Sequence, residues 1–154
     1  MRPAEPADAE TAFQVQRAAS LAAFAHVYPR DRYPYPDDDI RERWRSALAD
    51  GETHVLLAER DGRAVGVVCY GAERLDGFYV VPEEWGRGVG SALHDAVVAA
   101  QRELGVRACR LWTLEDNPRA RRFYEQRGWR LDGRRRTVPF PPYPEDVGYT
   151  LELG

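Results

Sequence analysis

An apolar strand-like run that leads through a glycine-rich turn into a helix constrains this chain more than any other feature. The run stops at Pro82, and Ser91 opens the helical pattern. Three glycines occupy alternate positions between them: Gly86, Gly88 and Gly90. Glycine tolerates positive φ and lets a backbone approach a ligand closely. The N–H groups of such a turn bind phosphate oxygens at a helix N-terminus, and Arg87 adds a positive charge. The turn favours a ligand with a pyrophosphate, although a ligand-free β–α turn uses the same glycines.

The two common nucleotide-binding motifs do not fit this turn. A dinucleotide fingerprint needs Gly-x-Gly-x-x-Gly, but Ser91 and Leu93 stand where the third glycine should fall in the two possible registers. A P-loop needs Gly-Lys-Ser/Thr, and all 22 basic residues of this chain are arginines. The ligand is therefore expected to be a pyrophosphate compound that neither motif serves.

A second informative segment runs from residue 117 to residue 129. Asn117 and Tyr124 are seven positions apart, about two helical turns, so both can face one ligand with Ala120 and Arg121 on the same side. Asn117 is a typical helix N-cap, and Gly128 is typical of a helix end. Taken alone, Tyr124 also fits a core position, and Asn117 fits a cap without any further role.

Together, the two segments resemble the GCN5-related N-acetyltransferases (GNAT superfamily). The acyl-CoA loop of that family, Gln/Arg-x-x-Gly-x-Gly/Ala, matches residues 85–90 with Trp85 as its departure. The second pattern, Asn-x-x-Ala-x-x-Phe/Leu-Tyr-x-x-x-Gly-Phe, matches residues 117–129 except at Trp129. The resemblance covers nearly the whole chain. It implies a transferase, specifically an acetyl-CoA-dependent N-acetyltransferase (acyltransferase), with acetyl-CoA as co-substrate.

The resemblance also implies a set of site residues. Cofactor contacts are expected at Phe78, Tyr79, Val80, Gly86, Arg87, Gly88, Val89, Gly90, Ser91, Asn117, Ala120, Arg121 and Tyr124. A backbone N–H of the strand end would polarise the thioester carbonyl, and Tyr124 would protonate the departing sulfur, because a phenol with its ordinary pKa of about 10 is protonated at neutral pH. Asp76 and Glu73 are the candidate general bases, and each also fits a solvated surface charge. The amine would attack directly, in a ternary complex.

The resemblance implies that two loops form the acceptor side, Tyr28–Asp39 and Val138–Asp146, both rich in tyrosine, proline and aspartate. Aromatic walls beside Asp37–Asp39 suit a cationic small-molecule amine, although these aspartates also suit a helix start. Arg134–Arg136 fits a solvated face better than a phosphate contact. Two other functions stay open: a protein N-terminal or side-chain acetyltransferase, and a non-catalytic acyl-CoA-binding module.

Local patterns predict one α/β (α+β) domain over residues 1–154. The order β-α-α-β-β-β-α-β-α-β-β gives a mixed sheet with helices on both faces. With the resemblance, we expect a mostly antiparallel sheet of six to seven strands flanked by about four helices, the acyl-CoA N-acyltransferase fold. The predicted strands are 2–4, 53–59, 64–70, 75–81, 107–114, 129–131 and 147–153, and the predicted helices are 7–24, 39–49, 91–104 and 118–127.

Composition bounds the partners and the compartment. A formal net charge of −3 argues against nucleic acid and anionic membranes as partners, and no apolar run is long enough to span a bilayer. Cys69 and Cys109 lie in apolar runs, as reduced thiols do, and no signal-like or metal-binding pattern is present. We therefore expect a cytoplasmic protein without a metal. His94 follows the inward-facing Leu93 and is expected on the surface. A homodimer would be in keeping with the family, but no pattern in the sequence indicates one.

Overall fold

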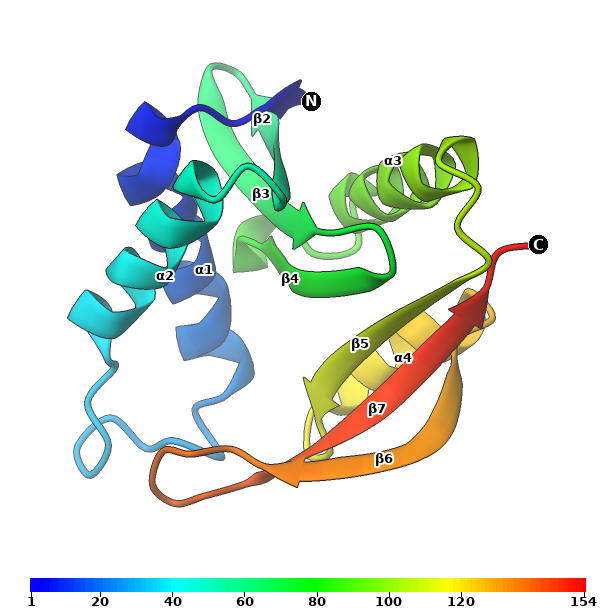
Figure 1. Cartoon of the computed structure of the whole chain (residues 1–154). Coiled ribbons are helices and arrows are strands. Elements are labelled where there is room, and N and C mark those ends of the chain that lie inside the picture. The colour runs from blue at the N-terminus through cyan, green and yellow to red at the C-terminus, as the bar shows by residue number, and fades with distance from the viewer.

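The computed structural model describes residues 1–154 and contains one seven-stranded sheet in the order β1-β2-β3-β4-β5-β7-β6 (Figure 1). The strands are β1 (Arg2–Pro3), β2 (His54–Arg60), β3 (Arg63–Tyr70), β4 (Arg74–Val80), β5 (Ala108–Leu114), β6 (Arg130–Thr137) and β7 (Glu145–Glu152). The helices are α1 (Ala9–Ala23), α2 (Asp37–Ala49), α3 (Val89–Glu103) and α4 (Pro118–Gln126), with 3₁₀ turns η1 (Pro6–Asp8) and η2 (Pro82–Glu84). The predicted fold class and element order are confirmed.

Neighbouring strands pair antiparallel, with the single exception of β4 and β5, which run parallel. The β2–β3 hairpin turns at Asp61-Gly62, where both residues have positive φ (55° and 74°). Two positive φ angles in succession are what a type I′ hairpin turn requires, so the Asp-Gly pair sets this register. The predicted mostly antiparallel sheet is therefore present.

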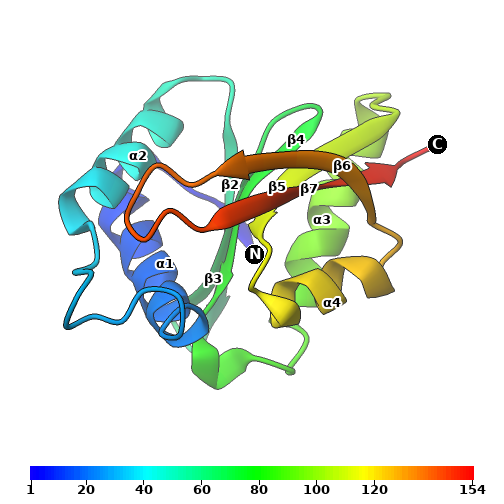
Figure 2. The ribbon, with the colours of Figure 1, turned by 90° about the horizontal axis from the view of Figure 1, so that it is seen from below.

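Helices cover both faces of the sheet, with α1 and α2 on one face and α3 and α4 on the other (Figures 1 and 2). Each helix buries one apolar side, as shown by fully buried Phe13 on α1 and Leu93 on α3. The indole Nε1 of Trp44 on α2 donates to Gln16 Oε1 at 2.8 Å and so ties α2 to α1. None of the helices has the length and apolar character that crossing a membrane requires.

The sheet opens between β4 and β5, and this opening creates the site. The two strands pair at only two positions, Arg74 with Arg110 and Leu75 with Leu111 (Figure 1). A register shift opposite Tyr70 leaves Asp76 without a partner on β3, which is a β-bulge where pairing with β5 ends. Beyond Leu75, β4 therefore keeps β3 on one edge and has a free edge on the other.

One predicted strand boundary and one predicted exposure are wrong. Arg134–Arg136 is expected to connect the last two strands, but it lies within β6, where the ion pairs Arg134–Asp132 and Arg136–Asp146 (2.8 and 3.0 Å) compensate its charge. His94 is expected on the surface, but it is only 6% exposed. Its Nε2 accepts a hydrogen bond from Trp129 Nε1 at 3.0 Å, because α4 and the strand after it cover this side of α3.

Candidate active site

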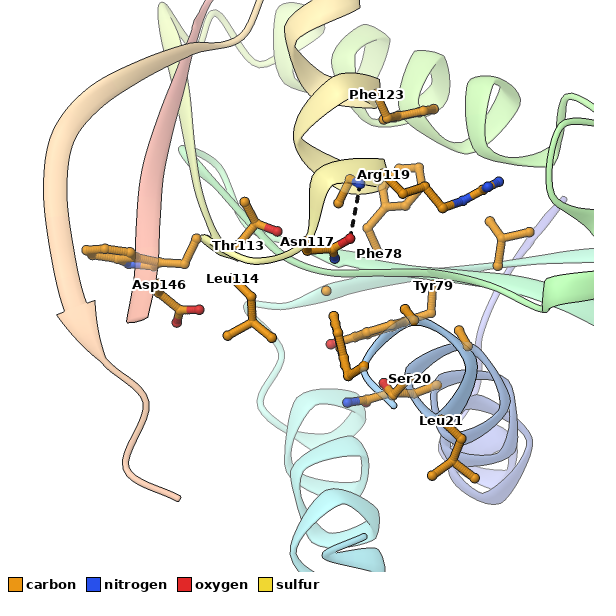
Figure 3. A pocket seen from close by; sticks show the side chains of 18 of the residues that line it. Ser20, Leu21, Phe78, Tyr79, Thr113, Leu114, Asn117, Arg119, Phe123 and Asp146 are labelled. Carbon is orange, nitrogen blue, oxygen red and sulfur yellow. Dashed lines mark hydrogen bonds between the residues drawn. The ribbon is translucent and has the colours of Figure 1, made fainter. Parts of the chain in front are cut away.

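The free edge of β4 borders a large cleft with a volume of about 1490 Å³ (Figure 3). One wall consists of the glycine turn before α3 and of α4, and the opposite wall consists of the end of α1, the segment 24–36 and part of α2. The β6–β7 connection borders one end, where the Arg43 guanidinium lies 5.6 Å from the centre of the Phe140 ring. The cleft can therefore hold one ligand on the glycine turn and a second one between the α1–α2 segment and the β6–β7 connection.

The backbone of β4 offers hydrogen-bond donors to this cleft. Val81 N–H donates to Val65 O of β3 at 2.9 Å, and strand residues alternate between edges, so the N–H groups of Phe78 and Val80 face the free edge. The carbonyl of Val80 accepts from Trp85 Nε1 at 2.7 Å. Tyr79, in contrast, directs its N–H to β3 and contributes only its side chain to the cleft, where burial raises the pKa of the phenol. Two of the three expected strand residues thus present donors.

The glycine turn exposes the N-terminus of α3. Gly86 and Gly88 have positive φ (75° and 92°), and Gly88 is an N-cap without a side chain. The first backbone bond of this helix is Ala92 N–H to Gly88 O at 3.0 Å, so the preceding N–H groups, through Ser91, have no intrahelical acceptor. Gly86, Gly88, Gly90 and Ser91 all line the cleft. This arrangement is suited to an anion such as a pyrophosphate.

Two residues of the glycine turn that are predicted to contact the cofactor have side chains that do not face the cleft. The Val89 side chain is 7% exposed and packs in the core near Gly66, so only its backbone faces the turn. Arg87 is exposed and does not line the cleft. The positive charge expected from Arg87 therefore comes from other residues.

Three arginines of α4 and its C-terminal end, which the sequence motifs do not single out, supply that charge. The Arg119 guanidinium lies 4.0 Å from the centre of the Trp85 ring, and Arg127 donates to Ser91 Oγ at 2.6 Å. Arg122 lines the same part of the cleft. Spacings of three and five place all three near one side of a helix, which is a signal that the sequence carries. Guanidinium groups match the geometry of phosphate oxygens.

The second predicted motif is only partly assembled. Asn117 and Ala120 line the cleft, and Asn117 Oδ1 also caps α4 by accepting from Ala120 N–H at 3.2 Å (Figure 3). Arg121 does not line the cleft. Its Nε donates to Tyr149 Oη at 2.9 Å, because Arg121 lies roughly 200° around the helix from Phe123, which faces the cleft. Arg121 thus joins α4 to β7 and has no contact with the cleft.

Tyr124 lies at the base of the cleft and is 7% exposed. Its ring packs against Phe78, Phe123 and Trp129, with centroid distances of 6.3, 5.5 and 5.7 Å. No group of the chain hydrogen-bonds its hydroxyl, and burial raises the pKa of the phenol. Tyr124 therefore stays protonated at neutral pH and has a free O–H donor.

The structure separates the two candidate bases. Asp76 lines the cleft, and its Oδ2 accepts from Arg74 Nε at 2.7 Å. Glu73 does not line the cleft and precedes β4, where its carbonyl accepts from Arg110 N–H at 3.0 Å. A third carboxylate, Asp146 of β7, lines the cleft and is 8% exposed (Figure 3). The pairing of β7 with β5 brings Asp146 there, and no local sequence pattern indicates this.

The acidic stretch that suggested a cationic acceptor does not reach the cleft. Asp37–Asp39 forms the first turn of α2, where the helix dipole favours acidic residues. Asp37 pairs with Arg17 at 3.0 Å, and Asp38 pairs with Arg41 at 3.6 Å. The aromatic residues of the two loops do line the cleft: Tyr28, Tyr33, Tyr35 and Phe140. The acceptor end therefore has aromatic walls without these aspartates.

The sequence and this geometry define a known class of protein. The chain belongs to the Acetyltransferase (GNAT) family, whose sequence profile matches residues 16–129. An uncharacterized N-acetyltransferase of Mycobacterium tuberculosis is 31% identical over 134 residues, which cover 82% of this chain and 85% of the relative. The family resemblance inferred from the motifs is confirmed, and the chain is an acetyl-CoA-dependent N-acetyltransferase.

Solved structures share the fold. A GCN5-related N-acetyltransferase from Rhodopseudomonas palustris superimposes with a TM-score of 0.82 at 24% identity and covers 99% of this chain and 94% of its own. The PaiA N-acetyltransferase from Thermoplasma acidophilum, solved in complex with coenzyme A, gives 0.75 at 19% identity and covers 98% and 96%. At these identities the likeness shows the acyl-CoA N-acyltransferase fold.

Proposed function

We propose that residues 1–154 form a single domain that transfers an acetyl group from acetyl-CoA to the amine of a small-molecule acceptor. The amine attacks the thioester directly while both substrates are bound. One observation carries this proposal: the exposed N-terminus of α3 and the unpartnered hydroxyl of Tyr124 belong to the same cleft, which continues to an aromatic end.

Acetyl-CoA fits the wall formed by the glycine turn and α4. The free N–H groups from Gly88 to Ser91 bind the pyrophosphate, and Arg119 and Arg127 add charge-assisted hydrogen bonds. The pantetheine arm lies along the free edge of β4, near the amide of Asn117. A backbone N–H of β4, from Phe78 or Val80, then donates to the thioester carbonyl and stabilises the oxygen as negative charge develops.

The reaction needs one proton donor and one proton acceptor. The amine nitrogen bonds to the thioester carbon, the C–S bond breaks, and Tyr124 donates its phenolic proton to the leaving sulfur. The amine proton passes to Asp76, the cleft carboxylate next to the β4 bulge. It then passes to the Tyr124 phenolate and restores the phenol. The products are an amide and free coenzyme A. Glu73 has no role in this scheme because it does not line the cleft.

Direct attack is supported by the state of the two cysteines. Burial raises the pKa of the Cys69 thiol to about 12 and that of the Cys109 thiol to about 11. A thiolate is the nucleophilic form of cysteine, and neither residue supplies one at neutral pH. An acetyl-cysteine intermediate is therefore disfavoured.

A small-molecule acceptor is supported by the two walls that border the acceptor end of the cleft. The α1–α2 segment and the β6–β7 connection both line it, and Arg43 on Phe140 joins the two walls. A protein N-terminus would need an open groove at this end. The test is release of coenzyme A, measured for a panel of small amines and a panel of peptides. Turnover of small amines supports the proposal, and turnover of peptides alone contradicts it.

A further inference from the structure

The cleft carries an uneven charge distribution. Seven arginines and three carboxylates line it, whereas the whole chain has a formal net charge of −3. Each of the three carboxylates already has an arginine: Asp76 has Arg74 (2.7 Å), Glu84 has Arg60 (3.2 Å) and Asp146 has Arg136 (3.0 Å). Arginines of the chain therefore offset the charge of all three carboxylates.

The remaining six arginines form two groups on opposite walls. Arg119, Arg122 and Arg127 lie beside the glycine turn, where the phosphates of coenzyme A provide their counter-charge. Arg30, Arg32 and Arg43 lie on the α1–α2 side, which is the acceptor end. No carboxylate of the chain lies within ion-pair distance of this second group. Guanidinium groups without a protein partner in a cleft are available to an anionic ligand.

Arg43 is the best placed of the second group. It projects from the middle of α2, a regular helix, so its backbone is fixed better than that of the two loop arginines. Its guanidinium lies 5.6 Å from the centre of the Phe140 ring, which keeps it at the junction of the two acceptor walls.

A second, independent observation on the same wall is a buried hydroxyl that has no hydrogen-bond partner. Tyr35 lines the cleft, and its hydroxyl is buried beside Ser20 and Gln16 without a hydrogen bond of normal geometry to either. A buried hydroxyl without a partner is unfavourable, so a ligand oxygen whose entry uncovers this group gains a hydrogen bond.

We propose that the acceptor amine carries an anionic group, a carboxylate or a phosphate, which Arg43 binds at the aromatic end of the cleft. This rests on the proposed function, because it assumes that the acceptor occupies this end. It also replaces the purely cationic acceptor that Asp37–Asp39 suggested, because those residues pair with Arg17 and Arg41 outside the cleft. The substrate class is thus a zwitterionic amine with an apolar or aromatic body.

The test uses matched probes that differ only in this group. Phenylalanine and phenylalaninamide form the carboxylate arm, and phosphoethanolamine and ethanolamine form the phosphate arm. Binding of each probe to the protein saturated with coenzyme A is measured by calorimetry for the wild type, Arg43→Gln and Arg45→Gln. Arg45 is the matched control, because it lies on the same helix, pairs with Glu42 at 3.4 Å and does not line the cleft.

The proposal predicts that, in at least one arm, the probe with the anionic group binds about tenfold more tightly than the probe without it. Arg43→Gln should abolish this preference, and Arg45→Gln should keep it. Equal or tighter binding of the probe without the anionic group in both arms overturns the proposal, as does a preference that survives Arg43→Gln. Acetyl transfer to the same probes is followed separately. Transfer to a probe without the preference for its anionic group would overturn this inference and leave the proposed function standing.

Discussion

Replacing Gly88 with alanine tests the phosphate-binding turn, because the structure separates its two expected effects. Gly88 has φ of 92°, and a Cβ there would meet no atom within 4 Å, so the substitution causes no collision. The penalty is conformational, about 1–2 kcal/mol for a residue with a side chain at positive φ. The turn can relieve this strain only by changing its backbone dihedral angles, and this changes the direction of the N–H groups at the start of α3. Loss of one hydrogen bond to a phosphate lowers affinity about 10- to 100-fold.

Gly105 provides the matched control. It has φ of 76°, no atom within 4 Å of an added Cβ, and a place after the end of α3, outside the cleft. Gly88→Ala and Gly105→Ala should therefore lose similar stability, measured by urea denaturation. Calorimetric titration with acetyl-CoA should show weaker binding for Gly88→Ala alone. The reasoning is refuted if Gly88→Ala binds acetyl-CoA like the wild type, or if Gly105→Ala weakens binding equally.

Three further predictions concern Tyr124 and His94. Tyr124→Phe keeps the ring and removes the proton, so turnover should fall about 10- to 1000-fold with acetyl-CoA affinity nearly unchanged, and an unaltered rate would exclude Tyr124 as the acid. Burial raises the pKa of Tyr124 above its ordinary value of about 10, so the wild-type rate should show no loss from phenol ionisation up to about pH 10; a decline centred below pH 9 that is absent in Tyr124→Phe would contradict this. Burial lowers the pKa of His94, so the unfolded chain binds its proton more readily, and the urea midpoint should fall as the pH drops below about 6.5. His94→Gln should remove that part of the fall, and an identical fall in this variant would show that other groups cause it.

The features that sequence could predict are those set by neighbours in the chain. The glycine turn, the Asn117 cap and the Asp61-Gly62 hairpin each depend on local backbone preferences, and the structure contains all three. The element order follows from apolar periodicity in the same way. A single sheet with helices on both faces then results, because each apolar face must be covered.

The features that sequence could not predict depend on which side of an element faces the cleft. Arg121 was grouped with Tyr124 by spacing, but the cleft side of α4 is centred near Phe123, so Arg119 and Arg127 face it instead. Helical spacing gives relative directions around an axis, and only packing fixes the absolute direction.

The carboxylates that reach the cleft and the burial of His94 also depend on contacts between distant parts of the chain. Asp37–Asp39 follows the tyrosine-rich segment in sequence, yet Arg17 and Arg41 hold two of its carboxylates outside the cleft. Asp146 enters the cleft only because β7 pairs with β5, opposite Leu114. His94 is buried because Trp129 from another element covers it. Each outcome involves residues that are far apart in the chain.

The most direct test of the mechanism is rapid-mixing measurement of coenzyme A thiol release from acetyl-CoA, with and without an amine that the panel identifies as an acceptor. Direct attack predicts release only when the amine is present, with no acetylated form of the protein in intact-mass spectra. A burst of thiol release without amine, together with an acetylated Cys69 or Cys109, would contradict the account.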